Sequence, residues 1–222
     1  MGEPAVGGAA GPPDPLRLDT VFLARHGETE WNRAGRRQGR LDSPLTEDGR
    51  AQVGRLARRV AALPVDAVFS SPLGRAAATA AVYAAVLGLP VSFVDDLQEV
   101  DGGRWAGLTD EEVDGAYPGA RQDRALDRYH WRYPGGESYA DADRRASAAL
   151  ALISDAGPRR PLIVSHAMIG RMLLRNLLRM EVDQALQLDL RHGLIYRVEV
   201  PAGRLVEIRT GSAELERWST ET

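Results

Sequence analysis

The sequence predicts an α/β protein: a three-layer α/β/α sandwich with a mainly parallel sheet and a hairpin at one edge. Two observations lead to this fold class. Short apolar runs typical of buried strands alternate along the chain with longer segments whose apolar residues recur at helical spacing. Towards the C-terminus this order changes to two alternating runs, 194–200 and 204–210, which flank Pro201-Ala202-Gly203 and indicate a hairpin.

Four apolar runs are expected to form the buried strands of the parallel part. They cover residues 21–24, 67–70, 91–94 and 161–165. Each run is short, contains valine, isoleucine, leucine or phenylalanine, and is followed by residues that favour a turn or the start of a helix. Because helical segments separate these runs, we expect parallel strands joined by crossovers.

Capping residues mark where several of the intervening helices begin. Thr46 precedes a helix with an acidic first turn, Thr109 and Glu112 form a capping-box pair, and Ser138 caps a longer helix. The polar and aromatic segment 117–134 has poor periodicity, and we interpret it as a lid or rim. The helices are expected at 47–63, 73–87, 109–115, 138–154 and 167–179.

Length and composition indicate one folded domain after a short tail. The chain has 222 residues, of which 44% are hydrophobic, so it can bury a substantial core. Residues 1–19 are rich in glycine and proline and bury too little apolar surface to offset their ordering, so we expect a disordered N-terminal tail. We therefore place the folded domain at residues 20–222.

Charge, cysteine content and hydropathy exclude several classes of partner. A net charge of -3 argues against a nucleic-acid partner, because no protein-wide positive field exists to neutralise many phosphates. No apolar run approaches the ~20 residues that span a bilayer, so we expect no membrane partner. The chain contains no cysteine, and its N-terminus lacks the apolar core of a secretion signal. We therefore expect a cytoplasmic protein; the sequence predicts no oligomeric state.

Histidines follow two of the predicted buried strands at the point where each strand ends. Arg25, His26 and Gly27 come directly after the first run, and His166 follows the last one. If these strands are neighbours in a parallel sheet, both imidazoles reach one bound group at its carboxyl edge. The helix after His166 adds backbone N–H donors for an anion.

A third basic residue points to the same chemistry. Arg75 falls in the first turn of an alanine-rich helix, where a cation opposes the helix dipole unless an anion lies nearby. The planar guanidinium groups of Arg25 and Arg75 match phosphate oxygens. Neither a metal nor another cofactor is expected, because the four histidines lack metal-binding spacing and no Walker-type loop is present.

The string Arg25-His26-Gly27-Glu28-Thr29-x-x-Asn32 resembles the signature of the histidine phosphatase superfamily, also called phosphoglycerate mutase-like. Residues 103–109 and 134–138 resemble two further elements of this family, and the resemblance covers most of 20–200. It implies a phosphohistidine intermediate on His26, phosphoryl binding by Arg25, Arg75 and His166, and a proton donor at Glu99. The implied catalytic residues are His26, Glu99 and His166, and the implied phosphate-binding residues are Arg25, Asn32 and Arg75.

The chemistry explains these residue types. His26 must be neutral, with one ring nitrogen free to attack phosphorus and the other donating a fixed hydrogen bond, for which a nearby backbone carbonyl is expected. Two guanidinium groups and His166 neutralise the phosphoryl oxygens. Glu99 protonates the departing alkoxide and then deprotonates the water that hydrolyses phosphohistidine.

We therefore predict a phosphatase, a phosphoric monoester hydrolase whose partner is a small phosphorylated metabolite. One alternative is a phosphoglycerate mutase, an isomerase that uses the same site; the other is a non-catalytic phosphate-binding regulatory protein. The family's mutases carry a longer insert with a lysine and paired arginines, whereas this chain has no lysine and a shorter insert. This favours hydrolysis.

Several residues leave the specificity open. Ala167 stands where the family commonly has glycine after the second histidine, and His192 stands where it often has an amide or a small residue. The arginines of 33–40 either recruit a charged substrate or form a solvated surface. The aromatic residues of 129–133 either stack on the substrate or fasten the lid.

Overall fold

The sheet that carries the two histidines has seven strands. A computed structural model of the chain describes residues 16–209 and 214–218. The strands are β1 (Thr20–Arg25), β2 (Ala67–Ser70), β3 (Val91–Phe93), β4 (Pro161–Ser165), β5 (Ile195–Glu199), β6 (Arg204–Ile208) and β7 (Glu214–Trp218). The helices are α1 (Glu30–Arg33), α2 (Glu47–Val60), α3 (Gly74–Leu87), α4 (Asp110–Ala116), α5 (Ala120–Leu126), α6 (Tyr139–Asp155), α7 (Ala167–Leu178) and α8 (Val182–Gln187).

The strand order is β3-β2-β4-β1-β5-β6-β7. The first four strands in this order are parallel, and the predicted hairpin, β5 and β6, continues the sheet in antiparallel fashion. Beyond it, β7 extends the sheet by a strand that the sequence pattern did not predict. The decisive neighbours are β1 and β4, whose register places Arg25 beside Ser165.

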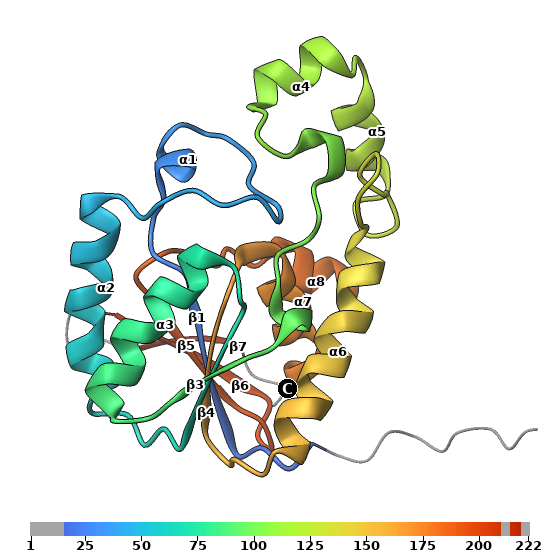
Figure 1. The fold of residues 1–222 in the computed structure, drawn as a ribbon. Coiled ribbons are helices and arrows are strands. Elements are labelled where there is room, and N and C mark those ends of the chain that lie inside the picture. Colours follow the sequence, from blue (N-terminus) through green and yellow to red (C-terminus); the bar gives the residue numbers. More distant parts are fainter. Residues whose placement is uncertain (1–15, 210–213, 219–222) are drawn as a thin grey trace, which may run out of the picture.

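Helices cover both faces of the sheet, as Figure 1 shows. Alternating residues of β1 separate two apolar cores: Phe22 packs with α2 and α3, whereas Leu23 packs with residues of α6 and α7. Successive side chains of a strand point to opposite faces, so one apolar run serves both cores. The predicted α/β/α sandwich is confirmed.

The predicted caps form as the sequence indicates. Oγ1 of Thr46 accepts from the N–H of Gly49 at 2.8 Å at the start of α2. Thr109 and Ser138 open α4 and α6 with complete capping boxes. Each cap satisfies N–H groups that a helix start otherwise leaves without a partner.

The N-terminal boundary lies earlier than predicted. Residues 1–15 of the predicted tail lie outside the described residues, but residues 16–19 pack against the domain. Leu18 is only 2% exposed, the N–H of Arg17 donates to Oγ of Ser154, and Asp19 forms an ion pair with Arg159. The folded region therefore includes Leu16 rather than starting at Thr20, because apolar packing resumes where the prolines and glycines end.

The predicted lid, residues 117–134, lies above the carboxyl ends of the parallel strands and contains one short helix, α5, which follows soon after α4 (Figure 1). Its aromatic residues pack around the buried Trp105, whose ring centroid lies 5.0 Å from that of Trp131 and 5.3 Å from that of Tyr133. These contacts fasten the segment to the domain, which favours the structural alternative for most of its aromatic residues. α5 escaped prediction because no residue of this seven-residue helix is fully buried.

Candidate active site

His26 and His166 meet at the carboxyl ends of β1 and β4. Their ring centroids are 5.1 Å apart, and their side chains are almost completely buried. The N–H of His26 donates to the carbonyl oxygen of Ser165 at 3.0 Å, which continues the ladder between the two strands. The sequence therefore placed two imidazoles correctly at strand ends, and the sheet order brings them together.

Hydrogen bonds assign the tautomer of His26. Nδ1 lies 2.8 Å from the carbonyl oxygen of Gly27, which can only accept, so Nδ1 carries the proton. Nε2 is then the unprotonated nitrogen, and it accepts from Nε of Arg75 at 3.3 Å. Burial, followed by the positive field of His166 and the nearby arginines, holds the pKa of His26 well below its usual range. The ring is thus neutral at neutral pH, and its Nε2 presents a lone pair to a partner.

His166 retains one nitrogen without a partner. Its Nε2 lies 2.8 Å from Oγ of Ser71, a buried hydroxyl that accepts from the N–H of Leu73 and whose own proton has no other acceptor among the described residues. We therefore assign the hydroxyl proton to the bond with Nε2, which leaves Nδ1 as a donor. Nδ1 is buried and has no partner among the described residues. A buried donor of this kind fits a site that awaits an acceptor.

Arg25 approaches the same site from the end of β1. Its Nη1 donates to the carbonyl oxygen of Leu190 at 3.0 Å, and its Nε is buried without a partner among the described residues. Burial lowers the pKa of Arg25 to about 10, so the guanidinium still carries its charge at neutral pH. Arg25 therefore supplies a second buried donor, Nε, that has no acceptor among the described residues.

Arg75 is held in place by its surroundings. Its Nη atoms donate to the carbonyl oxygens of Gly39 and Leu41, each at 2.7 Å. Nη1 also lies 2.9 Å from Oδ1 of Asp42. From the sequence, Arg75 in the first turn of a helix indicates a bound anion; in the structure, this carboxylate of the protein itself offsets the unfavourable helix dipole there. The two backbone carbonyls orient the guanidinium before any ligand binds.

Glu99 borders the cavity and caps α7. Its Oε1 accepts from the N–H groups of Val100 at 2.9 Å and Ile169 at 3.0 Å, and Oε2 accepts from the N–H of Met168 at 3.1 Å. The first turn of α7 was expected to offer N–H donors to an anion, and two of these donors bind this carboxylate. Glu99 is thus positioned by the helix that follows His166.

Asn32 lies at the third position of α1, the short helix that follows the histidine motif. Its Oδ1 accepts from the backbone N–H of Thr29 at 3.1 Å and from its hydroxyl at 3.0 Å, which closes a capping box on α1. The side chain also borders the cavity. The structure therefore places Asn32 at the site but shows a structural task for its oxygen.

Five of the six predicted site residues line one cavity of about 180 Å³, and the sixth, His166, lies directly behind them with its ring centroid 5.1 Å from that of His26. A larger depression of about 430 Å³ beside it includes Arg75 but neither histidine, so the smaller cavity is the candidate site. Its wall is formed by Arg25, His26, Asn32, Arg36, Arg37, Gln38, Gly39, Arg75, Glu99, Val100, Gly102, Tyr133, Ala167 and Met168.

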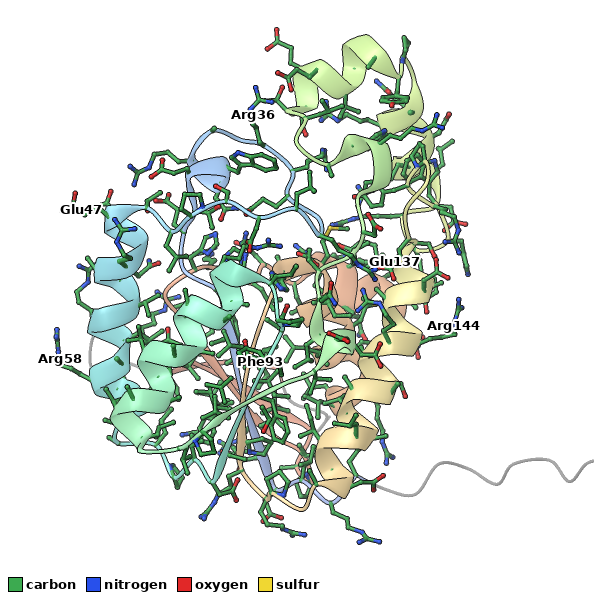
Figure 2. All side chains as sticks on the ribbon, viewed as in Figure 1. Arg36, Glu47, Arg58, Phe93, Glu137 and Arg144 are labelled. Atoms are coloured by element: carbon green, nitrogen blue, oxygen red, sulfur yellow. The ribbon has the colours of Figure 1, made fainter. Side chains whose placement is uncertain are left out.

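The arginine-rich loop forms one rim of this cavity and is neutralised by acidic residues. Arg36 forms a two-pronged ion pair with Glu112, and Arg37 pairs with Asp110. Both carboxylates lie in the first turn of α4, so these ion pairs connect the loop to α4. Figure 2 shows Arg36 between the loop and this helix. The sequence left open whether these arginines recruit a charged substrate or form a solvated surface. The structure shows features of both, because the arginines are paired with carboxylates, yet Arg36 and Arg37 line the cavity.

Residues 16–209 and 214–218 contain neither a metal-binding cluster nor a membrane-spanning helix. No cluster of three or more histidine and acidic side chains is arranged there to hold a metal ion. Within the same ranges, none of the helices has the length and apolar character that crossing a bilayer requires.

The geometry agrees with a comparison against known protein families. The sequence profile of the histidine phosphatase superfamily (branch 1) matches residues 21–211. The chain belongs to this superfamily. The predicted family is thereby confirmed.

Individual members resemble the chain over most of its length. The probable phosphoglycerate mutase GpmB of Salmonella choleraesuis is 35% identical over 185 residues, which cover 81% of this chain and 84% of the relative. A mycobacterial glucosyl-3-phosphoglycerate phosphatase, solved with VO3, is 29% identical with a TM-score of 0.75 and covers 82% and 91% of the two chains. The α-ribazole phosphatase of Shigella flexneri is 26% identical, with a TM-score of 0.75 and coverage of 81% and 89%. Both the phosphatase and the mutase interpretation fit these relatives.

The two departures from the histidine phosphatase pattern lie at the site. Ala167 borders the cavity directly. His192 donates from Nδ1 to the backbone oxygen of His26 at 2.6 Å, and the two ring centroids are 5.2 Å apart. Burial lowers the pKa of His192 to about 4. The sequence singled out His192 as unusual but not as a neighbour of the nucleophile, because the contact spans 166 residues.

Proposed function

We propose that the protein is a phosphatase that hydrolyses small phosphate monoesters through a phosphohistidine on His26. The observation that carries this proposal is a neutral imidazole beside two buried donors that lack partners. His26 presents an unprotonated Nε2, which accepts a long hydrogen bond of 3.3 Å from Nε of Arg75. Nε of Arg25 and Nδ1 of His166 are buried donors without partners among the described residues. A phosphoryl group supplies both the electrophile and the acceptors that this arrangement lacks.

In the first step, Nε2 of His26 forms a bond to phosphorus as the ester P–O bond breaks. Arg25, Arg75 and His166 neutralise the equatorial oxygens, and Nε of Arg75 turns from Nε2 to a phosphoryl oxygen. Because Gly39 and Leu41 already hold the guanidinium, little reorganisation is needed. Asn32 is proposed as a contact on the phosphate side.

Glu99 is proposed to move the proton in both steps. The leaving alkoxide takes a proton from the carboxyl group, and in the second step the carboxylate takes a proton from the water that attacks phosphorus. The N–P bond then breaks, which restores neutral His26 and releases inorganic phosphate. Oε2 accepts one backbone bond whereas Oε1 accepts two, so Oε2 is the oxygen we assign to proton transfer.

The size and composition of the cavity support a small metabolite as substrate. Its volume of about 180 Å³ lies below the roughly 300–1,000 Å³ of pockets that bury drug-sized ligands. The proposal includes a cytoplasmic location. It also includes one catalytic domain, which the sequence places at residues 20–222 and which the packing of residues 16–19 extends to Leu16.

A phosphoglycerate mutase is the second candidate, and the similarity to a relative named as a probable mutase favours it. The short segment that carries α4 and α5 favours hydrolysis. The helices α4 and α5 have only seven residues each, and no lysine is available from any part of the chain to grip a phosphoglycerate. A less enclosed phosphohistidine is open to water.

The test is a panel of phosphorylated metabolites assayed for phosphate release without added metal. An isomerisation assay of 3-phosphoglycerate with its bisphosphate primer runs in parallel. We expect phosphate release, an acid-labile phosphoprotein, and loss of both in His26→Ala. His130→Ala, which removes an exposed histidine, is the matched control and keeps full activity. Turnover that survives in His26→Ala defeats the proposal, and dominant isomerisation selects the mutase.

A further inference from the structure

The peptide between His26 and Gly27 is held from both sides by side chains that lie far away in the sequence. Its carbonyl oxygen, on His26, accepts from Nδ1 of His192 at 2.6 Å. Its N–H, on Gly27, donates to Oγ1 of Thr79 at 3.0 Å. His192 precedes β5 and Thr79 belongs to α3, so two separate parts of the fold fix the plane of this peptide. We call these two hydrogen bonds the clamp.

This peptide leads directly to the carbonyl that sets the tautomer of His26. The carbonyl oxygen of Gly27 accepts from Nδ1 of the same imidazole at 2.8 Å. Rotation of the preceding peptide would carry this oxygen away from the ring and release the proton from Nδ1. Gly27 lies close to α2, since a Cβ at this position would be 2.8 Å from Cγ2 of Val53 and 3.1 Å from the carbonyl oxygen of Gly49.

The hydroxyl oxygen of Thr79 is available to accept the hydrogen bond from the N–H of Gly27. Its side chain is fully buried, and its hydroxyl donates to the carbonyl oxygen of Arg75 at 2.8 Å. Because the single hydroxyl proton is used in this bond, the Oγ1 lone pairs remain for the N–H of Gly27. Thr79 therefore links the peptide of the nucleophile to the helix that carries Arg75.

His192 is anchored as well. The hydroxyl of Tyr196 accepts from the N–H of Arg191 at 2.7 Å and donates to the carbonyl oxygen of Asp189 at 3.0 Å, which ties down the chain beside His192. Its pKa of about 4 keeps the ring neutral at neutral pH, so it acts as a donor without placing another charge beside His26.

We propose that His192 and Thr79 are positioning residues that hold the imidazole of His26 in the tautomer and orientation required for attack on phosphorus. This inference rests on the proposed function, in which Nε2 of His26 is the nucleophile. Neither side chain belongs to the wall of the cavity, so both act through the His26–Gly27 peptide. Their loss should slow phosphorylation of His26 while substrate binding stays the same.

Matched pairs of variants separate the hydrogen bond from the shape. His192→Asn keeps an N–H donor near the place of Nδ1, whereas His192→Leu fills similar space without one. Likewise Thr79→Ser keeps the hydroxyl, and Thr79→Val replaces it with a methyl group. Groups that orient a functional histidine through hydrogen bonds typically contribute about 10–100-fold to activity, so we expect His192→Leu and Thr79→Val to slow phosphoenzyme formation by that factor. We expect KM to change by less than about twofold, and the Asn and Ser variants to restore most of the rate.

A measurement without substrate tests the clamp directly. Nitrogen-15 NMR of the histidine rings should show one tautomer of His26, protonated on Nδ1, in the wild type, His192→Asn and Thr79→Ser. His192→Leu and Thr79→Val should show a mixture of tautomers. Melting temperatures identify any variant that fails to fold, in which case the other pair decides.

Two results overturn the inference: equal phosphorylation rates within both pairs, or an unchanged His26 tautomer in both Leu and Val variants. Failure of the proposed function is a separate outcome. It appears as turnover in His26→Ala or as the absence of a phosphoprotein in the wild type, and it leaves the tautomer measurement interpretable.

Discussion

Nε of Arg75 donates a hydrogen bond of 3.3 Å to Nε2 of His26, so the guanidinium lies directly beside the nitrogen that we propose as the nucleophile. The same guanidinium is held by the backbone oxygens of Gly39 and Leu41. A donor fixed in this way stabilises developing charge without reorganisation, which is the main source of electrostatic catalysis.

Arg75→Lys should therefore lower kcat/KM strongly, although the charge is kept. A lysine cannot reproduce a fork that contacts two carbonyls and a phosphoryl oxygen, and loss of one such donor costs about 10²–10³-fold. Steady-state kinetics on the best substrate of the panel provide the measurement. Arg33→Lys is the control, because Arg33 pairs with Glu28 and Asp48 away from the cavity and should change kcat/KM little. A value for Arg75→Lys close to wild type would rule out this role.

Glu99→Gln should slow substrates in proportion to how much their leaving group needs a proton. General acid catalysis contributes about 10²–10⁴-fold, so alkyl phosphates should lose activity on that scale. Activated aryl phosphates should lose much less, because their leaving group departs as a stable anion. The comparison uses kcat/KM for one alkyl and one aryl ester. Equal losses on both would assign Glu99 to capping α7 at Met168 and Ile169 rather than to proton transfer.

The stability of the fold should fall as pH drops below neutrality. The pKa of His192 is about 4 in the folded protein and lies near 6.5 in the unfolded chain, so the unfolded chain binds more protons between these values. Folded-state stability is thus complete above about pH 6.5 and declines towards pH 4. Between pH 7.5 and 5 this single residue should account for about 2 kcal/mol of the unfolding free energy.

Urea unfolding at the two pH values measures this effect. His192→Asn should reduce the pH-dependent loss, whereas removal of the exposed His130 by His130→Gln should leave it as in the wild type. His26 and His166, whose pKa values also lie well below the usual range, add losses of the same sign in all three proteins. An identical pH dependence of His192→Asn and the wild type would contradict a buried neutral His192.

Glu137→Gln should destabilise the fold with little effect on chemistry. The carboxylate accepts from Arg145, Arg40 and the N–H of Asp101. Glu137, labelled in Figure 2 near the start of α6, is not among the residues that line the cavity. Removal of its charge leaves the largely buried Arg145 without its anionic partner, for which about 2–4 kcal/mol of unfolding free energy is expected.

Chemical denaturation measures the loss, with Asp19→Asn as control. Asp19 forms an exposed ion pair with Arg159, and exposed pairs contribute little. A large fall in kcat at unchanged stability would instead place Glu137 in the catalytic machinery. The predicted segment 134–138 would then be a substrate element rather than a structural one.

The sequence predicted those parts of the fold whose signals are local. Thr46, Thr109 and Ser138 cap helices because a cap needs only the three residues that follow it. The missing elements are those with weak local signals. α8 has six residues, and Glu214–Trp218 carries three charged residues yet forms β7 through its pairing with β6. Tertiary pairing overrides local preference in such strands.

The sequence by itself determined which residue types stand at each strand end: His26 after one apolar run, His166 after another, and Arg75 in the first turn of a helix. Only the tertiary structure decided that Leu23 pairs with Ile163, which makes β1 and β4 neighbours and brings the imidazoles together. It also decided that His192 reaches the backbone of His26. Strand order and the return path of the chain are set by burial of both sheet faces across the whole domain, a sum of long-range contacts that no local pattern encodes.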